Sequence, residues 1–280
     1  MSEGLRRPSI AWLSLPAGAW LCGFLLVPLG IVAVHSFALR GTYGAVEFGF
    51  HLQNYARAFE PMFIGVFLAS VRLAALTALS CAIAGFPVAW TIARARPRWR
   101  TPLLVALMVP FWTNFVIRTY ALKVLLSEHG AVNWAAVSLG LLAEPFDFAN
   151  SAFAIWLGML INYLPFMVLP LYVALEKFDF TLMEAARDLG AGPVRAFFRV
   201  LLPGVRPGLV SGLVFVLTPA LGEFVIPDML GGARTLLIGN VITDQFLKSR
   251  DWAFGSALSL LLIGVIGFNL VLLLRKGRES

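Results

Sequence analysis

The chain has 280 residues, of which 59% are hydrophobic and only 13% are charged. An average soluble domain is roughly 45–50% apolar and about 25% charged, so the composition excludes an ordinary soluble globule. There are 22 Lys and Arg against 15 Asp and Glu, a formal net charge of +7, and in a membrane protein such an excess is expected in cytoplasmic loops. The sequence therefore predicts an all-α integral membrane protein.

Long uncharged stretches predict about six transmembrane helices, because about 20 apolar residues suffice for one span. The first is expected at 12–36, and its apolar core is longer than the roughly 7–15 residues of a secretory signal, so we expect it to stay uncleaved. The others are expected at about 63–93, 101–126, 148–175, 207–230 and 252–274. Two weaker apolar segments do not predict spans: 130–143 predicts an interfacial or re-entrant helix, and 236–246 predicts an amphipathic helix near the outer surface.

The basic residues divide unequally between the two sides of this topology. Seven fall on one side, whereas fourteen fall in the two tails and in the loops after the second and fourth spans. The positive-inside rule then predicts that both termini and both basic loops are cytoplasmic. No nucleic-acid partner is expected, because no basic stripe carries interleaved aromatic residues. The fourteen are Arg6, Arg7, Arg94, Arg96, Arg98, Arg100, Lys177, Arg187, Arg195, Arg199, Arg206, Arg275, Lys276 and Arg278.

Catalytic and metal-binding patterns are absent from the sequence. The cysteines Cys22 and Cys81 lie in apolar runs and are expected to be buried apolar residues. The histidines His35, His51 and His129 lack the spacing of a metal site, and the sequence contains neither a GxSxG elbow nor a phosphate-binding glycine loop. We therefore expect a protein that moves a solute, is not an enzyme, and binds neither a metal nor a cofactor by itself.

Charges inside the predicted spans are costly and so mark places of interest. Arg72, Arg118 and Glu223 all fall in the outer third of the membrane on this topology. In one interpretation the arginines reach the surface and one of them pairs with Glu223; in the other, Glu223 or Asp228 lies on the path of a cation. The two acids are five residues apart, so they share a helix face only if Pro227 distorts the turn.

The loop 176–206 carries the most distinctive pattern in the chain. Thr181 followed by Glu184 predicts a capping box and a helix that starts near residue 182. Gly190 predicts a left-handed stop, and Pro193 predicts the start of a second helix. The apolar face of that second helix is expected to consist of Val194, Phe197, Phe198 and Leu201.

This loop resembles the EAA loop of bacterial ATP-binding-cassette (ABC) importer permeases. The family pattern is EAA, three residues, G, nine residues, then I, any residue, L, P. Here it is matched by Glu184, Ala185, Ala186, Gly190, Val200, Leu202 and Pro203, with Val200 in place of isoleucine. The resemblance implies that the loop is a coupling helix that docks into a groove on a cytoplasmic ATPase.

Further motifs from about residue 70 onward resemble those of the spermidine/putrescine permease subunits. They lie at 109–114, 117–118, 164–168, 184–190, 222–227 and 238–242, with one departure at Ala253, where that family has proline. The resemblance implies a type I ABC importer permease fold in the bacterial inner membrane. It also implies a heterodimer with a second permease subunit, an ATPase dimer that binds ATP and Mg²⁺, and a periplasmic substrate-binding protein.

The expected organisation follows from these patterns. Residues 1–62 hold the N-terminal tail, the first span and a periplasmic loop; 63–275 form the permease core; and 276–280 are a cytoplasmic tail. A polyamine or related organic cation is the expected substrate. The alternatives are an anion, iron or other small solute carried by the same machine, or else a passive channel or intramembrane enzyme. The predicted substrate pathway consists of Trp112, Asn114, Tyr120, Tyr163, Glu223, Phe224 and Asp228.

Overall fold

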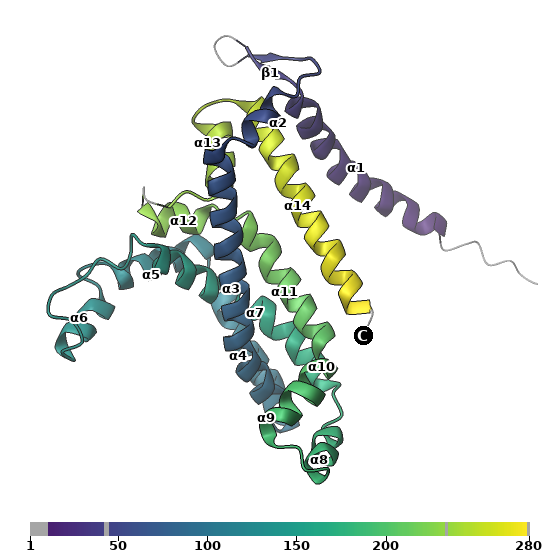
Figure 1. The fold of residues 1–280 in the computed structure, drawn as a ribbon, viewed down its shortest axis with the longest axis vertical. Helices are drawn as coiled ribbons and strands as arrows, with labels where there is room; N and C mark the ends of the chain where they lie inside the picture. The colour runs from purple at the N-terminus through teal and green to yellow at the C-terminus, as the bar shows by residue number, and fades with distance from the viewer. Residues whose placement is uncertain (1–10, 42–44, 233–234, 279–280) are drawn as a thin grey trace, which may run out of the picture. The chain divides into compact units, whose positions relative to one another are not determined.

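The computed structural model describes residues 11–41, 45–232 and 235–278, and most of these residues are helical (Figure 1). The chain forms two compact units. One contains the chain through Glu60 together with Ile242–Leu261, and the other contains Pro61–Val241 together with the chain from Leu262 onward. Helices α13 and α14 each have residues in both units.

The first unit joins the N-terminal helix to a small lobe. Its elements are α1 (Ala11–Ser36), the strands β1 (Leu39–Arg40) and β2 (Val46–Glu47), α2 (Gln53–Ala58), and parts of α13 (Ile238–Leu247) and α14 (Trp252–Arg278). The strands pair antiparallel, with Leu39 opposite Glu47. Asn54 donates to the carbonyl oxygens of Ser36 and Ala38, which fixes α2 against the end of α1. Arg57 forms a 3.0 Å ion pair with Asp251.

The second unit contains the main helical bundle. Its elements are α3 (Pro61–Arg94), α4 (Pro97–Met108), η2 (Val109–Trp112), α5 (Phe115–Leu126), α6 (Ala131–Ser138), α7 (Ala152–Glu176), α8 (Thr181–Asp188), α9 (Pro193–Ala196), η3 (Phe197–Leu201), α10 (Leu202–Gly204), α11 (Arg206–Leu221) and α12 (Val225–Leu230). Helices α3, α7 and α11 pack against one another and form its core. A side chain at Gly208 would lie 2.6 Å from the carbonyl oxygen of Pro170, and one at Gly212 would lie 2.5 Å from the sulfur of Met167, so glycine permits this close packing against α7.

Four helices in the described residues are long and apolar enough to cross a membrane, at Gly18–Ser36, Pro61–Arg94, Ala152–Glu176 and Trp252–Val271. These confirm the first, second, fourth and sixth predicted spans. Two bent helix pairs raise the number to as many as six if each pair is one span. They are Pro97–Trp112 with Phe115–Ser138, bent by 86°, and Pro193–Gly204 with Arg206–Leu221, bent by 70°.

The third predicted span, expected as one helix at 101–126, is wrong in shape. The helix gives way to a 3₁₀ turn at Val109–Trp112, and Thr113 is extended. Asn114 then accepts hydrogen bonds from the backbone N–H groups of Val116 and Ile117, so it caps a new helix in a new direction. A proline followed by a strong N-cap residue accounts for the bend.

The fifth predicted span, expected at 207–230, is also divided. Helix α11 ends at Leu221, and α12 begins at Val225. Pro227 therefore lies near the start of a second short helix, where its missing N–H costs little. Glu223 lies in the break between the helices, not inside a continuous span.

The two weaker segments form helices α6 and α13, as the sequence predicts. Cys81 is buried, whereas Cys22 is exposed on α1, so the expectation that both are buried is wrong for Cys22. Cys22 lies in the span Gly18–Ser36, most of whose residues are exposed in the chain alone and so can be covered by lipid.

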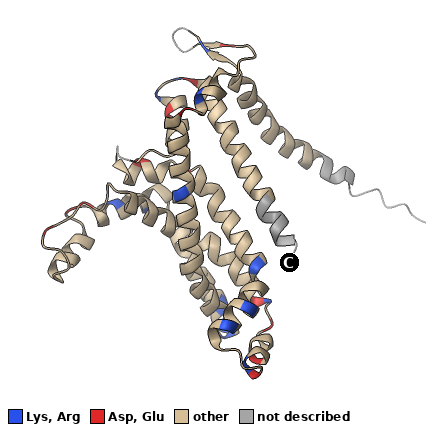
Figure 2. Ribbon diagram, in the orientation of Figure 1, with Lys and Arg blue, Asp and Glu red and all other residues tan. Residues whose placement is uncertain are grey.

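Basic side chains gather at one end of the second unit, where α4 begins and where α8 and α9 lie (Figure 2). The two basic loops touch there: the rings of Trp90 and Phe180 are 5.4 Å apart, and Arg100 forms a 3.1 Å ion pair with Glu176. The contact between these two segments agrees with the prediction that both basic loops lie on the same side of the membrane. Arg6, Arg7 and Arg234 lie outside the described residues, as do the side chains of Arg275, Lys276 and Arg278.

Candidate functional site

The predicted coupling loop forms two short helices joined by a tight turn. Helix α8 covers Thr181–Asp188, and Gly190 follows in the left-handed region with φ +82°. Gly192 precedes the first residue of α9, which is Pro193. The structure thus places the stop and the restart where the sequence predicts them, and the turn depends on a glycine because other residues are strained at this φ.

The start of α8 differs from the predicted capping box. The hydroxyl and the backbone N–H of Thr181 both donate to Oδ1 of Asp179, at 2.8 and 3.0 Å. These hydrogen bonds, the hydroxyl's first, lower the pKa of Asp179. Ionised Asp179 therefore stabilises the start of α8 above the usual carboxyl pKa, and this stabilisation disappears as the pH falls through the lowered value. The box is wrong because Asp179 takes the hydroxyl that would otherwise cap the helix.

The EAA residues of α8 are accessible to a partner protein. Glu184 and Ala185 are exposed and Ala186 is half-buried, whereas Met183 points inward and anchors the helix. The apolar side chain of Leu189, just before the turn, is 89% exposed. The two residues after Glu184 are alanines, so a partner surface can approach this side of α8 closely.

The second helix of the loop does not have the single apolar face that was expected. Leu201 is fully buried, but Val194 and Phe198 are exposed. The five residues Phe197–Leu201 form a π-helical turn, which shifts the register of the side chains that follow and so divides the predicted face. Val194, Phe198 and Arg195 line an open pocket of about 630 Å³ beside the Gly190 turn.

The second half of the EAA pattern lies where the loop returns to the bundle. Val200 and Leu202 are half-buried, and Pro203 is exposed near the start of α10. Gly204 lies against the ring of Phe178, so close that a side chain at this position would overlap it. These residues anchor the loop, whereas Glu184 and Ala185 project from it.

Glu223 lies in the break between α11 and α12 and is buried there. Its Oε1 atom accepts hydrogen bonds from the backbone N–H groups of Val225, at 2.9 Å, and of Ile226, at 3.2 Å. Its Oε2 atom accepts a hydrogen bond from the hydroxyl of Tyr163 on α7. The carboxylate thus closes the N-terminus of α12 and ties it to α7. No arginine pairs with Glu223 in the part of the chain that the structure describes.

The bend after η2 is held by Arg118. Its Nε atom donates to Oδ1 of Asn162 at 2.7 Å, and its Nη1 atom donates to the carbonyl oxygen of Pro110 at 2.6 Å. The guanidinium carbon lies 4.6 Å from the centre of the Phe111 ring. Arg118 is therefore a clamp between η2, α5 and α7. Arg72, by contrast, is exposed on α3.

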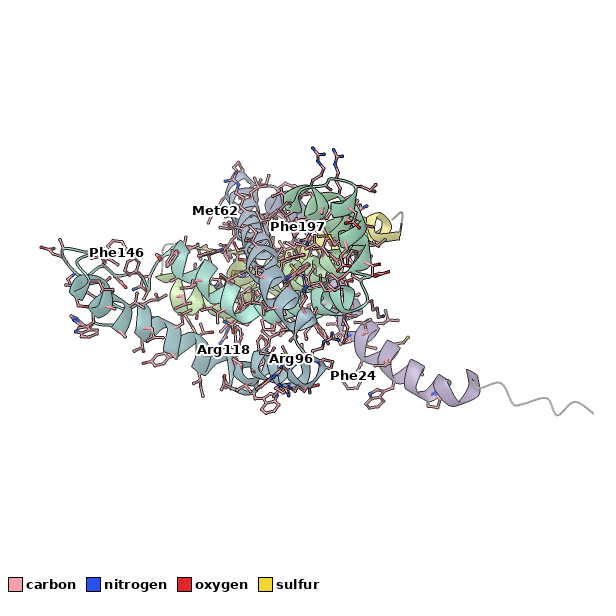
Figure 3. All side chains as sticks on the ribbon, turned by 90° about the horizontal axis from the view of Figure 1, so that it is seen from below. Phe24, Met62, Arg96, Arg118, Phe146 and Phe197 are labelled. Atoms are coloured by element: carbon pink, nitrogen blue, oxygen red, sulfur yellow. The ribbon has the colours of Figure 1, made fainter. Side chains whose placement is uncertain are left out.

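The other predicted pathway residues differ in setting. Tyr163 meets Glu223, and Asn114 caps α5. Trp112, Tyr120 and Phe224 have exposed rings, and Asp228 is exposed on α12. The buried Glu223 and the exposed Asp228 therefore do not share one environment, even with the break in the helix. Figure 3 labels Arg118 on α5 and Phe146 in the loop between α6 and α7, both in the second unit.

Three contacts were not predicted from the sequence. Asn240 on α13 donates to the carbonyl oxygen of Phe224, and Gly239 lies directly against the backbone of residues 222–223. The rings of Phe111 and Phe166 meet edge to face with their centres 5.6 Å apart. Each of these two phenylalanines directly follows a proline within a span, Pro110 or Pro165, which is the one sequence signal that they share.

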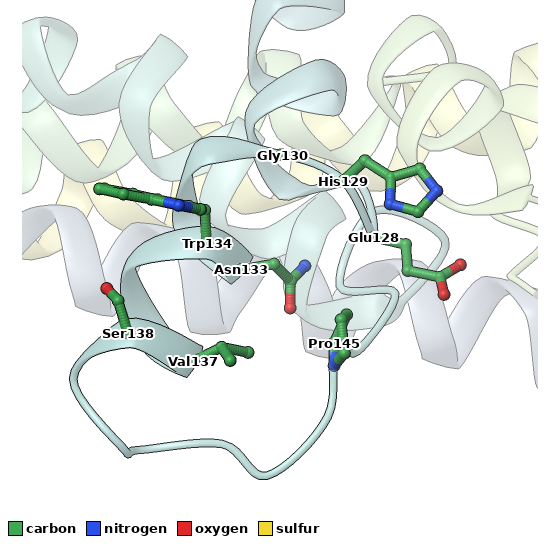
Figure 4. Close-up of a pocket in the computed structure, with 8 residues that line it drawn as sticks. All are labelled: Glu128, His129, Gly130, Asn133, Trp134, Val137, Ser138 and Pro145. Carbon is green, nitrogen blue, oxygen red and sulfur yellow. The ribbon is translucent and has the colours of Figure 1, made fainter.

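A separate pocket of about 370 Å³ lies between the end of α5 and α6 (Figure 4). Its lining includes Glu128, His129 and Trp134, and it contains none of the predicted pathway residues. Asn133 holds its wall together, because its side chain bonds the backbone of Ser127 and of Phe146. This pocket is thus built around a structural asparagine.

Comparisons with known proteins match nearly the whole chain. The family model described as "Binding-protein-dependent transport system inner membrane component" matches residues 5–278. The chain is 42% identical over 259 residues to the spermidine/putrescine transport system permease protein PotB of Salmonella typhimurium (strain LT2), which covers 92% of this chain and 90% of the relative. It is 41% identical to PotB of Escherichia coli (strain K12), with 92% and 94% covered.

Among solved structures, the chain is similar to one chain of a bacterial ABC transporter involved in the import of the acidic polysaccharide alginate. The TM-score is 0.77, with 18% sequence identity, and the match covers 96% of this chain and 95% of the other. At this identity the likeness shows the fold, which is that of an ABC importer permease. The bends and short surface helices described above therefore belong to a known architecture.

Proposed function

From the premise that the chain belongs to the family of inner-membrane components of binding-protein-dependent transport systems, we propose that it forms half of the membrane pathway of a polyamine importer. It is a multi-pass protein of the inner membrane and a transporter subunit, not an enzyme. The observation that carries the proposed substrate is the 42% identity to spermidine/putrescine permeases over 92% of the chain. The alginate importer supports the fold alone.

The partners follow from the chemistry that the chain lacks. Its sequence has no phosphate-binding glycine loop, so ATP and Mg²⁺ are bound by a cytoplasmic ATPase dimer. A second, similar permease subunit completes the pathway as a heterodimer, and a periplasmic binding protein delivers the substrate. Another importer of this fold has been solved in complex with a periplasmic protein that carries its ligand, which supports this arrangement.

The coupling loop transmits ATPase motion to the bundle. Exposed Glu184 and Ala185 on α8 dock into a groove of the ATPase, with Ala186, Gly190, Val200, Leu202 and Pro203 shaping and anchoring the loop. Closure of the ATPase pair moves α8, and the short connection through α9, η3 and α10 passes that movement to α11. The pathway then opens alternately to the two sides of the membrane. With this end of the second unit in the cytoplasm, its basic residues follow the positive-inside rule (Figure 2).

The substrate is a flexible organic cation that needs negative charge and aromatic surface along its way. The exposed Asp228 and the rings of Trp112, Tyr120 and Phe224 supply these, together with the buried Tyr163 and Glu223 and the capping residue Asn114. Aromatic faces attract ammonium groups, and intramembrane carboxylates attract the charge of a passing cation.

Stimulation of the ATPase by loaded binding protein tests the substrate. The complete complex is reconstituted in proteoliposomes with its cognate binding protein, and hydrolysis is measured with putrescine, spermidine, sulfate or ferric iron. We expect stimulation by a polyamine and none by sulfate or iron. Stimulation by sulfate or iron without any response to polyamines would contradict the proposed substrate.

A further inference from the structure

A continuous row of side chains links Arg118 to Glu223 within the second unit. The guanidinium of Arg118 lies over the ring of Phe111, and the centres of the Phe111 and Phe166 rings are 5.6 Å apart at an interplanar angle of 88°. The Phe166 ring is in turn 6.2 Å from the ring of Tyr163, whose hydroxyl donates to Glu223. Three aromatic rings thus lie between a fixed positive charge and a fixed negative charge.

Both charged ends are already held by the protein. Arg118 donates to Asn162 and to the carbonyl oxygen of Pro110, while Glu223 accepts from two backbone N–H groups and from Tyr163. Tyr163 is only 6% exposed, but Phe166 is 41% exposed. The ring of Phe166 is therefore the part of the row that is open to a ligand.

The surroundings of Phe166 favour the pathway over the lipid. Charged and amide groups within membrane spans face the bundle interior or a wet cavity, because hydrocarbon cannot solvate them. The row holds Arg118, Asn162 and Glu223 close to this exposed ring. An exposed aromatic ring beside these polar groups therefore suits a pathway for a hydrated solute better than a surface facing lipid.

The row also shows that one of its own rings accepts a cation. The guanidinium of Arg118 lies 4.6 Å from the ring centre of Phe111, a distance typical of cation–π contacts. One face of Phe111 is thus occupied from within the chain. Phe166, next in the row towards Glu223, has the same chemistry, and no cation among the described residues lies over its ring.

We propose that the ring of Phe166 is a transient binding site for an ammonium group of the substrate. The inference rests on the proposed polyamine transport and adds a specificity-determining residue to it. The carboxylate of Glu223 draws the ammonium group to the ring, and the nearby positive charge of Arg118 keeps the binding weak. Weak binding is what a pathway requires, because a group that binds must also leave.

Fluorination of the Phe166 ring tests this directly, since each added fluorine weakens the negative face of the ring with little change in size. Phenylalanine with one, two or three fluorines is incorporated at position 166 of the complete importer, and uptake of labelled putrescine and spermidine is measured in proteoliposomes. We expect the uptake rate to fall stepwise with each fluorine, to roughly one fifth at three fluorines. Phe166→Tyr should retain transport. Phe166→Leu should reduce the uptake rate about as much as the ring with three fluorines does.

Phe153 provides a matched control on the same helix. It is 49% exposed, contacts Phe148 and Trp156, and lies roughly 20 Å along α7 from Phe166. The same fluorinated series at Phe153 should leave uptake unchanged. A complex that transports polyamines with equal rates across the series at Phe166, or with equal losses at both positions, would overturn this inference alone. A wild-type complex that transports no polyamine would overturn the proposed function together with it.

Discussion

At the scale of single residues, Glu223 shows how a costly group can serve two purposes. A buried carboxylate must be supplied with hydrogen-bond donors, and here the first N–H groups of α12 and the hydroxyl of Tyr163 supply them. The same contacts determine where α11 ends and how α12 leaves it. The negative charge that we propose for cation transport is therefore part of the local architecture as well.

The contact of α13 with this break leads to a prediction about two glycines. A side chain at Gly239 would lie 2.6 Å from the carbonyl oxygen of Glu223 and 2.7 Å from that of Gly222, and neither backbone atom can move away easily. Gly239→Ala should lower the free energy of unfolding by about 1–3 kcal/mol, as overpacking does. Thermal unfolding of the purified complex measures this.

Gly222 is the matched control, because a side chain there meets no atom within 4 Å and its φ of −94° suits any residue. Gly222→Ala should change the free energy of unfolding by less than about 0.5 kcal/mol. Equal stability of the two variants would show that α13 does not lock the break between α11 and α12.

At the scale of elements, apolar length was sufficient to predict most of the spans but not their bends. Four long helices lie where uncharged runs predict them. The bend after Trp112 depends on the capping by Asn114 and on the clamp by Arg118, and the latter forms only once α7 supplies Asn162. The sequence predicted that Thr181 caps α8, and only the structure shows that its hydroxyl donates to Asp179 instead.

The turn between α8 and α9 leads to a prediction at this scale. Gly190 has a φ of +82°, which costs any other residue about 1–2 kcal/mol. Gly190→Ala should therefore displace α8 and reduce ATP-driven uptake by about fivefold or more. Gly192→Ala, where there is open space and an ordinary φ of −63°, should stay within about twofold of wild type. Uptake that is equally reduced in both variants would contradict a special role for the turn.

At the scale of the whole molecule, the coupling loop and the row from Arg118 to Glu223 differ in how far they could be predicted from the sequence. The turn of the coupling loop at Gly190 and the helix starts on either side of it could be predicted, because their pattern is local, whereas the cap of α8 and the apolar face of the second helix could not. The row from Arg118 to Glu223 could not be predicted, because Phe111 and Phe166 are far apart in sequence and because Arg118 lies over Phe111 only once the chain has bent after η2. Local structure can be predicted from a local sequence pattern, whereas contacts across a helical bundle depend on how the helices pack.

The central claim is that α8 couples ATP hydrolysis in a partner to polyamine import through this chain. It is tested most directly by ATP-driven uptake of labelled spermidine into proteoliposomes that contain the complete importer with wild-type chain or with Glu184→Lys. Glu144→Lys is the control, because Glu144 is also exposed but lies outside the coupling loop. We predict uptake with wild type and Glu144→Lys and its loss with Glu184→Lys. ATP-driven uptake that persists in Glu184→Lys at the wild-type rate would contradict the account.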